Sequence, residues 1–362
     1  MEKEQNSDEK DLVKPRNYAY HLDVTGKSRI PSAEAPSQRY IEHMTQWERN
    51  PEKFIVADYP LHLNIELSSK CNMWCRGCPR HTRARAAGDM DFGLYKKIID
   101  EGIINGEQRL QAVAPEWLGE PFLYPQIIDA IRYAKDKGVL DARINTNGTL
   151  IEESMAKRII SESGLDRIIF SLDAINEETY KSFKPGAKRK NYFKAVNENI
   201  DKFIELKEKI GTKKPIVYVQ MIYREETRDE LVNFLLYWHN KSDFVRIALY
   251  QSSDGNPDDR NRALQAPETI FPCPQLWQRM AIAWDGLVSP CVGDNGTREP
   301  LGNVKEKSVY DMWHGERINE LREMHKNGRV ENLEMCNHCD LNKIPKEIIN
   351  YNNKIKNNGV KI

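Results

Sequence analysis

Three of the chain's seven cysteines lie within eight positions of the stretch SSKCNMWCRGCPRH, residues 68–81. Cys71, Cys75 and Cys78 follow the spacing Cys-x3-Cys-x2-Cys. A structural zinc ion needs four closed ligands, and a disulfide needs two thiols. Iron–sulfur clusters are normally held by four cysteine thiolates. Three thiolates on one loop therefore suit a four-iron cluster that keeps one iron open to an exchangeable ligand.

The other four cysteines lie in the last quarter of the chain. Cys273 and Cys291 flank the run PQLWQRMAIAWDGLVSP, and Cys336 and Cys339 form a Cys-x2-Cys pair. Four cysteines in this arrangement are also the ligand set of a structural zinc site. The residues alone leave zinc and a second iron–sulfur cluster both open.

Composition narrows the possible partners. The 362 residues carry a formal net charge of zero, which gives no reason to expect nucleic acid or an anionic membrane surface as a partner. No apolar run reaches the roughly 18 residues of a membrane helix, and the first residues, MEKEQNSDEKDLVK, lack the apolar core of a signal peptide. We predict a cytoplasmic protein with no membrane partner, in which reduced cysteines serve metal binding or catalysis.

Short β-rich runs alternate with amphipathic helical stretches from residue 61 onward. The predicted strands are residues 61–67, 109–115, 141–146, 167–172, 216–222 and 244–249. The predicted helices are residues 92–104, 125–137, 152–163, 192–210 and 227–239. This alternation indicates a parallel sheet, and six units predict an α/β fold: a partial (β/α)6 TIM-like barrel followed by a small α+β domain.

The texture of the chain suggests four parts. Residues 1–57 read as an irregular N-terminal arm with two aromatic pieces that pack on the body. The barrel is placed at 58–255, the cysteine-containing auxiliary domain at 256–345, and a Lys- and Asn-rich tail at 346–362. A polar stretch, SSDGNPDDRNRALQAPE, marks the boundary between the two domains.

Polar features follow five of the predicted strands at their carboxyl ends. In parallel barrels these ends share one rim, where the chemistry collects. The features are the first cysteine loop, Gly119-Glu120-Pro121, Asn145-Thr146-Asn147-Gly148, Ser171 with Asp173, and Gln220.

With these neighbours, the first cysteine loop resembles that of the radical S-adenosylmethionine (SAM) enzymes. In that family the open iron binds SAM, whose reductive cleavage gives a 5′-deoxyadenosyl radical that abstracts hydrogen from a substrate. Gly119-Glu120-Pro121 is similar to the family's Gly-Gly-Glu-Pro motif, with Leu118 in place of the first glycine. Another departure is Gly77, where relatives often carry an aromatic residue before the third cysteine; Trp74 is a possible substitute.

The resemblance implies a set of SAM contacts on the rim. Glu120 would accept from the SAM ammonium, Thr146 and Asn147 would contact its ribose or carboxylate, and Ser171 matches a similar position. Lys184 falls where relatives often place an arginine on the SAM carboxylate, and Gln220 with Met221 would line the adenine. A lysine keeps the charge there but loses the two-pronged donor.

The C-terminal segment resembles the SPASM/twitch extension of radical SAM enzymes. The shared pattern is a cysteine, a hairpin ending in Trp284-Asp285-Gly286, a second cysteine, Leu301-Gly302-Asn303-Val304, a helix with Trp313, and Cys-x2-Cys. Full SPASM domains have about seven cysteines, so four imply one auxiliary [4Fe–4S] cluster with all its irons ligated by protein. The expected cofactors are SAM and two [4Fe–4S] clusters, with electrons supplied by a donor such as flavodoxin or ferredoxin.

The cysteine count bears on the reaction. Three plus four ligands use all seven cysteines, so no spare thiol remains to return a hydrogen atom, as radical epimerases commonly require. Loss of an electron to the auxiliary cluster gives net dehydrogenation instead. We therefore predict a radical SAM oxidoreductase, and oxidation of a small polar substrate such as a sugar, nucleotide sugar or aminocyclitol is favoured.

Candidate substrate residues are polar side chains expected at the barrel mouth. Tyr223, Arg224 and Arg246 are the predicted catalytic residues, because an arginine near the reacting oxygen would stabilise its negative charge. The same arginines are commonly surface residues or members of strand-end ion pairs. His81, Tyr250 and Gln251 complete the set. Two alternatives stay open: a peptide maturase that forms an oxidative crosslink or epimerises residues, and a non-catalytic protein with zinc in both sites.

Overall fold

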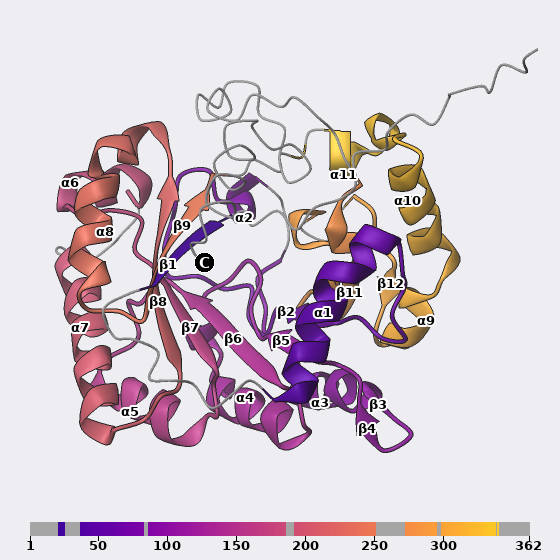
Figure 1. Cartoon of the computed structure of the whole chain (residues 1–362), viewed down its shortest axis with the longest axis horizontal. Coiled ribbons are helices and arrows are strands. Elements are labelled where there is room, and N and C mark those ends of the chain that lie inside the picture. Colours follow the sequence, from indigo (N-terminus) through magenta and orange to yellow (C-terminus); the bar gives the residue numbers. More distant parts are fainter. Residues whose placement is uncertain are drawn as a thin grey trace, which may run out of the picture.

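The computed structural model describes a barrel wall flanked by a smaller cysteine-bearing unit (Figure 1). The described residues are 21–25, 37–82, 86–185, 192–250, 272–294, 298–337 and 339. The predicted linker at 252–268, Gln251 and the C-terminal tail lie outside these residues.

Six parallel strands form the wall of the barrel. Their order in the sheet is β9-β8-β7-β6-β5-β2. Barrel strands that follow one another along the chain are therefore adjacent in the sheet, and helical segments connect them. The strands are β2 (His62–Ile65), β5 (Ala112–Ala114), β6 (Asp141–Thr146), β7 (Arg167–Ser171), β8 (Ile216–Tyr223) and β9 (Phe244–Leu249). The predicted partial (β/α)6 barrel is confirmed.

The two faces of this sheet differ in polarity. Residues such as Ile144, Phe170 and Val219 belong to a continuous apolar core that includes side chains of the covering helices. Because side chains alternate along a strand, Arg143, Ser171 and Gln220 project from the opposite, concave face. The sheet therefore buries its helix-facing side and keeps a polar lumen.

Helices cover the convex side of the sheet (Figure 1). They are α3 (Phe92–Glu101), α4 (Ile127–Asp136), α5 (Glu153–Glu162), α6 (Glu177–Phe183), α7 (Tyr192–Ile210) and α8 (Leu231–His239). The short α2 (Pro79–Thr82), which follows the first cysteine loop, is not part of this outer layer (Figure 1). The predicted helix at 92–104 ends earlier, because β3 (Ile103–Ile104) and β4 (Glu107–Gln108) form a hairpin. Its turn, Asn105-Gly106, takes positive φ at both residues.

The N-terminal arm is more regular than the sequence indicated. Residues Gln38–Lys53 form α1, and β1 (His21–Thr25) pairs antiparallel with β9. Ser37 caps α1 by accepting from the backbone N–H of Tyr40, and Arg39 donates to the carbonyl oxygens of Gln108 and Gly138. The expectation of an irregular arm was wrong for these segments, because their contacts are to residues far away in the sequence.

The cysteine-bearing unit continues the barrel sheet. Strand β10 (Arg279–Ile282) pairs parallel with β2, and the antiparallel strands β11 (Leu287–Ser289) and β12 (Gly302–Asn303) follow. Three helices complete the unit: α9 (Val309–Trp313), α10 (Glu316–Lys326) and α11 (Glu334–Asn337). The described strands other than the β3–β4 hairpin thus form one ten-stranded sheet that carries both cysteine groups.

None of the helices in the described part of the chain is long and apolar enough to cross a membrane.

Candidate active site and metal centres

The first cysteine loop leaves the carboxyl end of β2 and ends at α2. Cys71, Cys75 and Cys78 are partly exposed, and the backbone N–H of Cys78 donates to the Cys75 carbonyl at 3.2 Å. Burial raises the pKa of the Cys75 thiol to about 11, although the nearby Lys184 charge acts in the opposite direction. The thiols lose their protons when they ligate metal.

The Gly119-Glu120 turn packs directly against this loop. A Cβ added to Gly119 would stand 2.0 Å from the Ser68 carbonyl oxygen, so this position has no room for a side chain. The backbone N–H of Glu120 donates to the carbonyl of Lys70 at 2.8 Å. The departure at Leu118 leaves this close approach intact, because the second glycine makes it.

The Glu120 carboxylate is the centre of a buried hydrogen-bond network. It accepts from Thr146 Oγ1 at 2.7 Å, from the Asn147 backbone N–H at 2.9 Å and from the Phe122 N–H at 3.3 Å. Burial raises its pKa to about 7 against the opposing effect of these donors. The structure thus brings three of the predicted SAM contacts together, while their role toward SAM stays a prediction.

Asn72 joins the cysteine loop to the same network. Its Oδ1 accepts from Asn147 Nδ2 at 2.9 Å, and its Nδ2 donates to Thr149 Oγ1 at 2.7 Å. Sequence reasoning missed this residue, although it stands next to the first cysteine.

The predicted contacts on β7 and β8 form a second group. Gln220 Nε2 lies 3.4 Å from Ser171 Oγ, and both face the lumen. Lys184 is buried, donates to the Ser171 carbonyl at 2.6 Å and pairs with Asp173 at 3.2 Å. Asp173 itself has φ of +66° and accepts from the Ile222 N–H at 3.1 Å. Lys184 therefore already has a counter-ion, which the sequence did not indicate.

The three predicted catalytic residues occupy different environments. The Arg224 guanidinium is sandwiched between the rings of Phe183 and Tyr250, 4.7 and 4.6 Å from their centroids. Arg246 lies 4.6 Å from the Tyr218 ring, and Tyr223 lies 3.5 Å from Arg228 Nε. The structure does not gather them around one point, and their catalytic role stays a prediction.

Tyr250 fills the space that the missing aromatic residue leaves above the cysteine loop. A Cβ on Gly77 would lie 3.0 Å from the Tyr250 hydroxyl, and Gly77 has φ of +74°. Trp74, the substitute suggested by sequence, is instead 47% exposed and stacks on His81 with centroids 4.9 Å apart. An aromatic side chain from the end of β9 thus covers a position that the sequence motif leaves empty.

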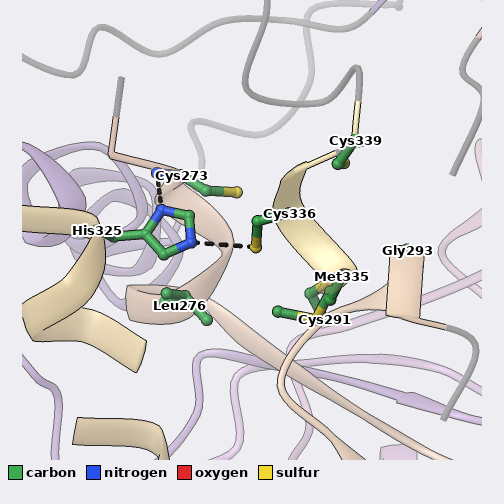
Figure 2. Close-up of a pocket in the computed structure, with 8 residues that line it drawn as sticks. All are labelled: Cys273, Leu276, Cys291, Gly293, His325, Met335, Cys336 and Cys339. Carbon is green, nitrogen blue, oxygen red and sulfur yellow. Dashed lines mark hydrogen bonds between the residues drawn. The ribbon is translucent and has the colours of Figure 1, made fainter. Parts of the chain in front are cut away.

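The four C-terminal cysteines meet in one cavity (Figure 2). All four are buried, and the remaining wall consists of Leu276, Met335, His325 and Gly293. Burial raises the pKa of Cys273 to about 12 and that of Cys291 well above its usual value. Four cysteines around an apolar cavity fit the donor set of a fully ligated iron–sulfur cluster.

His325 contacts two of these cysteines. The backbone N–H of Cys273 donates to its Nδ1 at 3.1 Å, and its Nε2 lies 3.2 Å from Cys336 Sγ. Figure 2 shows the imidazole between the two segments. His325 is buried, and its ring contacts the sulfur of Cys336.

A hydrogen bond joins the loop before Glu120 to the residue after Cys291. Trp117, in the loop between β5 and Glu120, donates from Nε1 to the carbonyl of Val292 at 2.8 Å. Val292 directly follows Cys291. Nothing in the sequence spacing indicated this contact.

Within the described residues, no three Cys, His, Asp or Glu side chains are arranged to hold a single metal ion. That the seven cysteines ligate iron–sulfur clusters stays a prediction.

Comparison with known proteins places the chain in a family. Residues 65–237 match the radical SAM superfamily, and residues 273–340 match the SPASM iron–sulfur cluster-binding domain. The chain therefore belongs to the radical SAM superfamily and carries a SPASM domain. It is an enzyme of a class that uses SAM and iron–sulfur clusters.

Two curated relatives cover most of the chain. A "Tungsten-containing aldehyde ferredoxin oxidoreductase cofactor-modifying protein" from Pyrococcus furiosus is 28% identical, over 77% of this chain and 87% of the relative. An "S-adenosyl-L-methionine-dependent 2-deoxy-scyllo-inosamine dehydrogenase" from Niallia circulans is 22% identical, over 77% of this chain and 92% of the relative.

Two solved structures share the fold. BtrN in complex with AdoMet and 2-DOIA is 18% identical with a TM-score of 0.52, covering 77% of this chain and 92% of that one. The enzyme anSMEcpe with bound AdoMet and the Cp18Cys peptide is 16% identical with a TM-score of 0.57, covering 82% and 96%.

Proposed function

We propose that this protein is a radical SAM oxidoreductase that dehydrogenates a small polar molecule and passes the electron to an auxiliary cluster. The observation that carries this proposal is the hydrogen bond from Trp117 to Val292. Trp117 lies three residues before Glu120, and Val292 follows Cys291, so the SAM-site loop and the auxiliary-site loop are in direct contact.

The residues divide the work between two sites. Cys71, Cys75 and Cys78 would hold the first cluster, and Glu120 with Asn147 would orient SAM beside it. When bound, SAM and the reduced cluster supply a 5′-deoxyadenosyl radical. The sheet holds both loops at the carboxyl ends of its strands, where Tyr250 lies against Gly77 of the cysteine loop.

Oxidation of an alcohol to a ketone removes one hydrogen atom, one proton and one electron. The hydrogen atom goes to the 5′-deoxyadenosyl radical, and the proton goes to a protein base or water. Cys273, Cys291, Cys336 and Cys339 would hold a second [4Fe–4S] cluster that accepts the electron. An electron donor such as flavodoxin or ferredoxin would restore the first cluster, in a reducing, cytoplasmic setting.

A second candidate is the modification of a redox enzyme's cofactor. The Pyrococcus furiosus relative carries that description, and the alignment covers 87% of its length. This candidate keeps the same two centres and changes only the substrate.

The proposal is tested by anaerobic reconstitution. Wild-type protein should bind roughly eight irons, and the Cys71→Ala/Cys75→Ala/Cys78→Ala variant roughly four, as two four-iron clusters require. With dithionite and SAM, only the wild type should form 5′-deoxyadenosine. Zinc with little iron would overturn the proposal. Transfer of deuterium from a labelled polyol into 5′-deoxyadenosine would identify the substrate class.

A further inference from the structure

The barrel lumen contains an arginine whose guanidinium forms no ion pair with a described residue. On β6, Ala142 and Ile144 pack into the helix-facing core, so Arg143 and Asn145 face the lumen. Arg143 is partly buried, and Asn145, one alternation nearer the rim, is exposed. The lumen is therefore open to solvent at Asn145, and Arg143 lies one alternation deeper and keeps part of its surface exposed.

The neighbouring Arg167, unlike Arg143, has a carboxylate partner. Arg167 stands beside Arg143 in the β6–β7 register, and its guanidinium holds Asp141 through two nitrogens, Nε at 2.9 Å. The guanidinium of Arg143 forms no hydrogen bond or ion pair with any residue that the structure describes, because Asp141 is held by Arg167. Burial and the charges of Arg279 and Arg167 lower its pKa to about 9, against the attraction of Asp141 and Glu116.

A partly buried charge without a partner is unfavourable, and buried charges are normally paired. A guanidinium that faces a solvent-filled cavity is suited to two-pronged binding of a carboxylate or phosphate. We propose that the substrate carries an anionic oxygen group that Arg143 binds inside the barrel. This inference rests on the proposed function, in which the substrate enters the lumen, and it adds the substrate's charge.

The test measures oxyanion binding by calorimetry on the reconstituted protein with SAM present. The probes are inorganic pyrophosphate and succinate, which distinguish a phosphate from a carboxylate as the natural group. One of them should bind to the wild type, and Arg143→Gln should weaken that binding at least tenfold. Arg158→Gln, at an exposed residue paired with Glu162 on α5, is the matched control and should bind as the wild type does.

Equal binding by wild type and Arg143→Gln, or no binding of either probe, would overturn the inference. Arg143→Lys keeps the charge without the planar fork and should give an intermediate affinity, which replaces the comparison if Arg143→Gln does not fold. 5′-Deoxyadenosine formation from SAM and dithionite is measured on the same samples. If the wild type forms no 5′-deoxyadenosine, the result counts against the proposed function. If it forms 5′-deoxyadenosine but binds neither oxyanion, the result counts only against the Arg143 site.

A second inference concerns His325. Because a backbone N–H donates to Nδ1, that nitrogen carries no proton, and the ring proton of the neutral imidazole lies on Nε2. Nε2 lies 3.2 Å from Cys336 Sγ and is directed toward it (Figure 2). The imidazole is held in this orientation because it is 1% exposed.

Hydrogen bonds to the ligand sulfurs are one of the features that set the reduction potential of an iron–sulfur cluster. We infer that His325 donates an N–H···S hydrogen bond to a ligand of the auxiliary cluster and raises its potential, which favours acceptance of the substrate's electron. His325 is thus a positioning residue that acts through Cys336. This rests on the auxiliary cluster of the proposed function.

The test isolates that cluster. In the Cys71→Ala/Cys75→Ala/Cys78→Ala background, redox-poised electron paramagnetic resonance gives the midpoint potential of the remaining cluster. His325→Leu should shift the potential to more negative values, and His325→Gln, which keeps an N–H donor, should stay near the parent. Identical potentials in the parent and His325→Leu would overturn the inference. If His325→Leu fails to bind iron, His325→Phe preserves the ring volume and carries the same comparison.

Discussion

The two cysteine groups differ in how the chain brings them together. Cys71, Cys75 and Cys78 lie on one loop of eight residues and are partly exposed. Cys273, Cys291, Cys336 and Cys339 come from three separate segments and are buried in a shared cavity. The first group depends on local spacing and leaves room for an exchangeable ligand. The second depends on how the turn at Cys273, the loop after β11 and helix α11 pack together, and its cysteines are buried.

This contrast predicts that losing one cysteine of the first group mainly affects activity, whereas losing one of the second group mainly affects thermal stability. Cys71→Ala should abolish 5′-deoxyadenosine formation and change the melting temperature by no more than about 1 °C, because its loop is partly exposed. Cys291→Ala should lower the melting temperature by 5 °C or more, since the buried cluster contributes to folding and a cavity is left. Anaerobic circular dichroism melts and chromatography of the SAM products measure both.

The contrast would fail if Cys71→Ala destabilised the fold as much as Cys291→Ala. Iron content, measured on the same samples, shows which cluster each variant has lost.

A smaller effect is expected at Glu120. Its pKa of about 7 means that the carboxylate is mostly protonated at pH 6 and mostly ionised at pH 8, with Lys184 and Glu116 as its charged neighbours. Since only the carboxylate attracts the SAM ammonium, the affinity of the reconstituted protein for SAM should fall about tenfold from pH 8 to pH 6. Calorimetry at several pH values measures this dependence.

Glu120→Gln should remove that dependence and weaken SAM binding at pH 8 by about 10- to 100-fold, as loss of a charged hydrogen bond implies. Glu116 also has a pKa raised to about 7 by burial, so Glu116→Gln is the matched control. It should keep a pH dependence of SAM binding, moved to lower pH because one neighbouring negative charge is removed. In the protein without SAM, the stability that Glu120 contributes decreases as pH rises, whereas SAM binding strengthens. The pKa of Glu120 in the folded protein exceeds the ordinary glutamate value of 4.5, so this group's contribution to the free energy of unfolding falls as pH rises from 4.5 to 7.

The smallest effect concerns the link between the two regions. Trp117→Phe keeps an aromatic ring but removes the donor to Val292. Backbone hydrogen exchange in residues 287–294 should speed up about fivefold, which corresponds to one hydrogen bond of about 1 kcal/mol. Hydrogen-exchange mass spectrometry measures this change.

Trp313→Phe is the control, because Trp313 also donates its Nε1 proton to a distant carbonyl, that of Ala57 at 2.7 Å. It should affect exchange around residues 57–61 and leave 287–294 unchanged. If Trp117→Phe leaves exchange at 287–294 unchanged, the contact does not hold the two regions together.

Much of the barrel was predictable because its signals are local. The predicted strands at 141–146 and 244–249 coincide with β6 and β9, and the predicted helix at 192–210 coincides with α7. Period-two and helical patterns report on burial within a few residues of each other. We predicted no helix for the segment 38–53 because we found little apolar periodicity there. Its helix is held by contacts with distant residues, such as that of Arg39 with the Gly138 carbonyl.

The sequence by itself determined the chemistry of the first site. The spacing of three cysteines, a glutamate after a glycine and polar residues at the strand ends lie within short windows, and parallel strands bring those windows to one rim. Tertiary structure alone decided that Tyr250 lies against Gly77, that Trp117 reaches Val292 and that His325 contacts Cys336. It also decided that Arg143 faces the lumen without an ion pair to any described residue. These contacts depend on which distant segments pack together. The alternation of side chains along a strand predicts which of them share a face of the sheet, but it does not predict which residues they contact there.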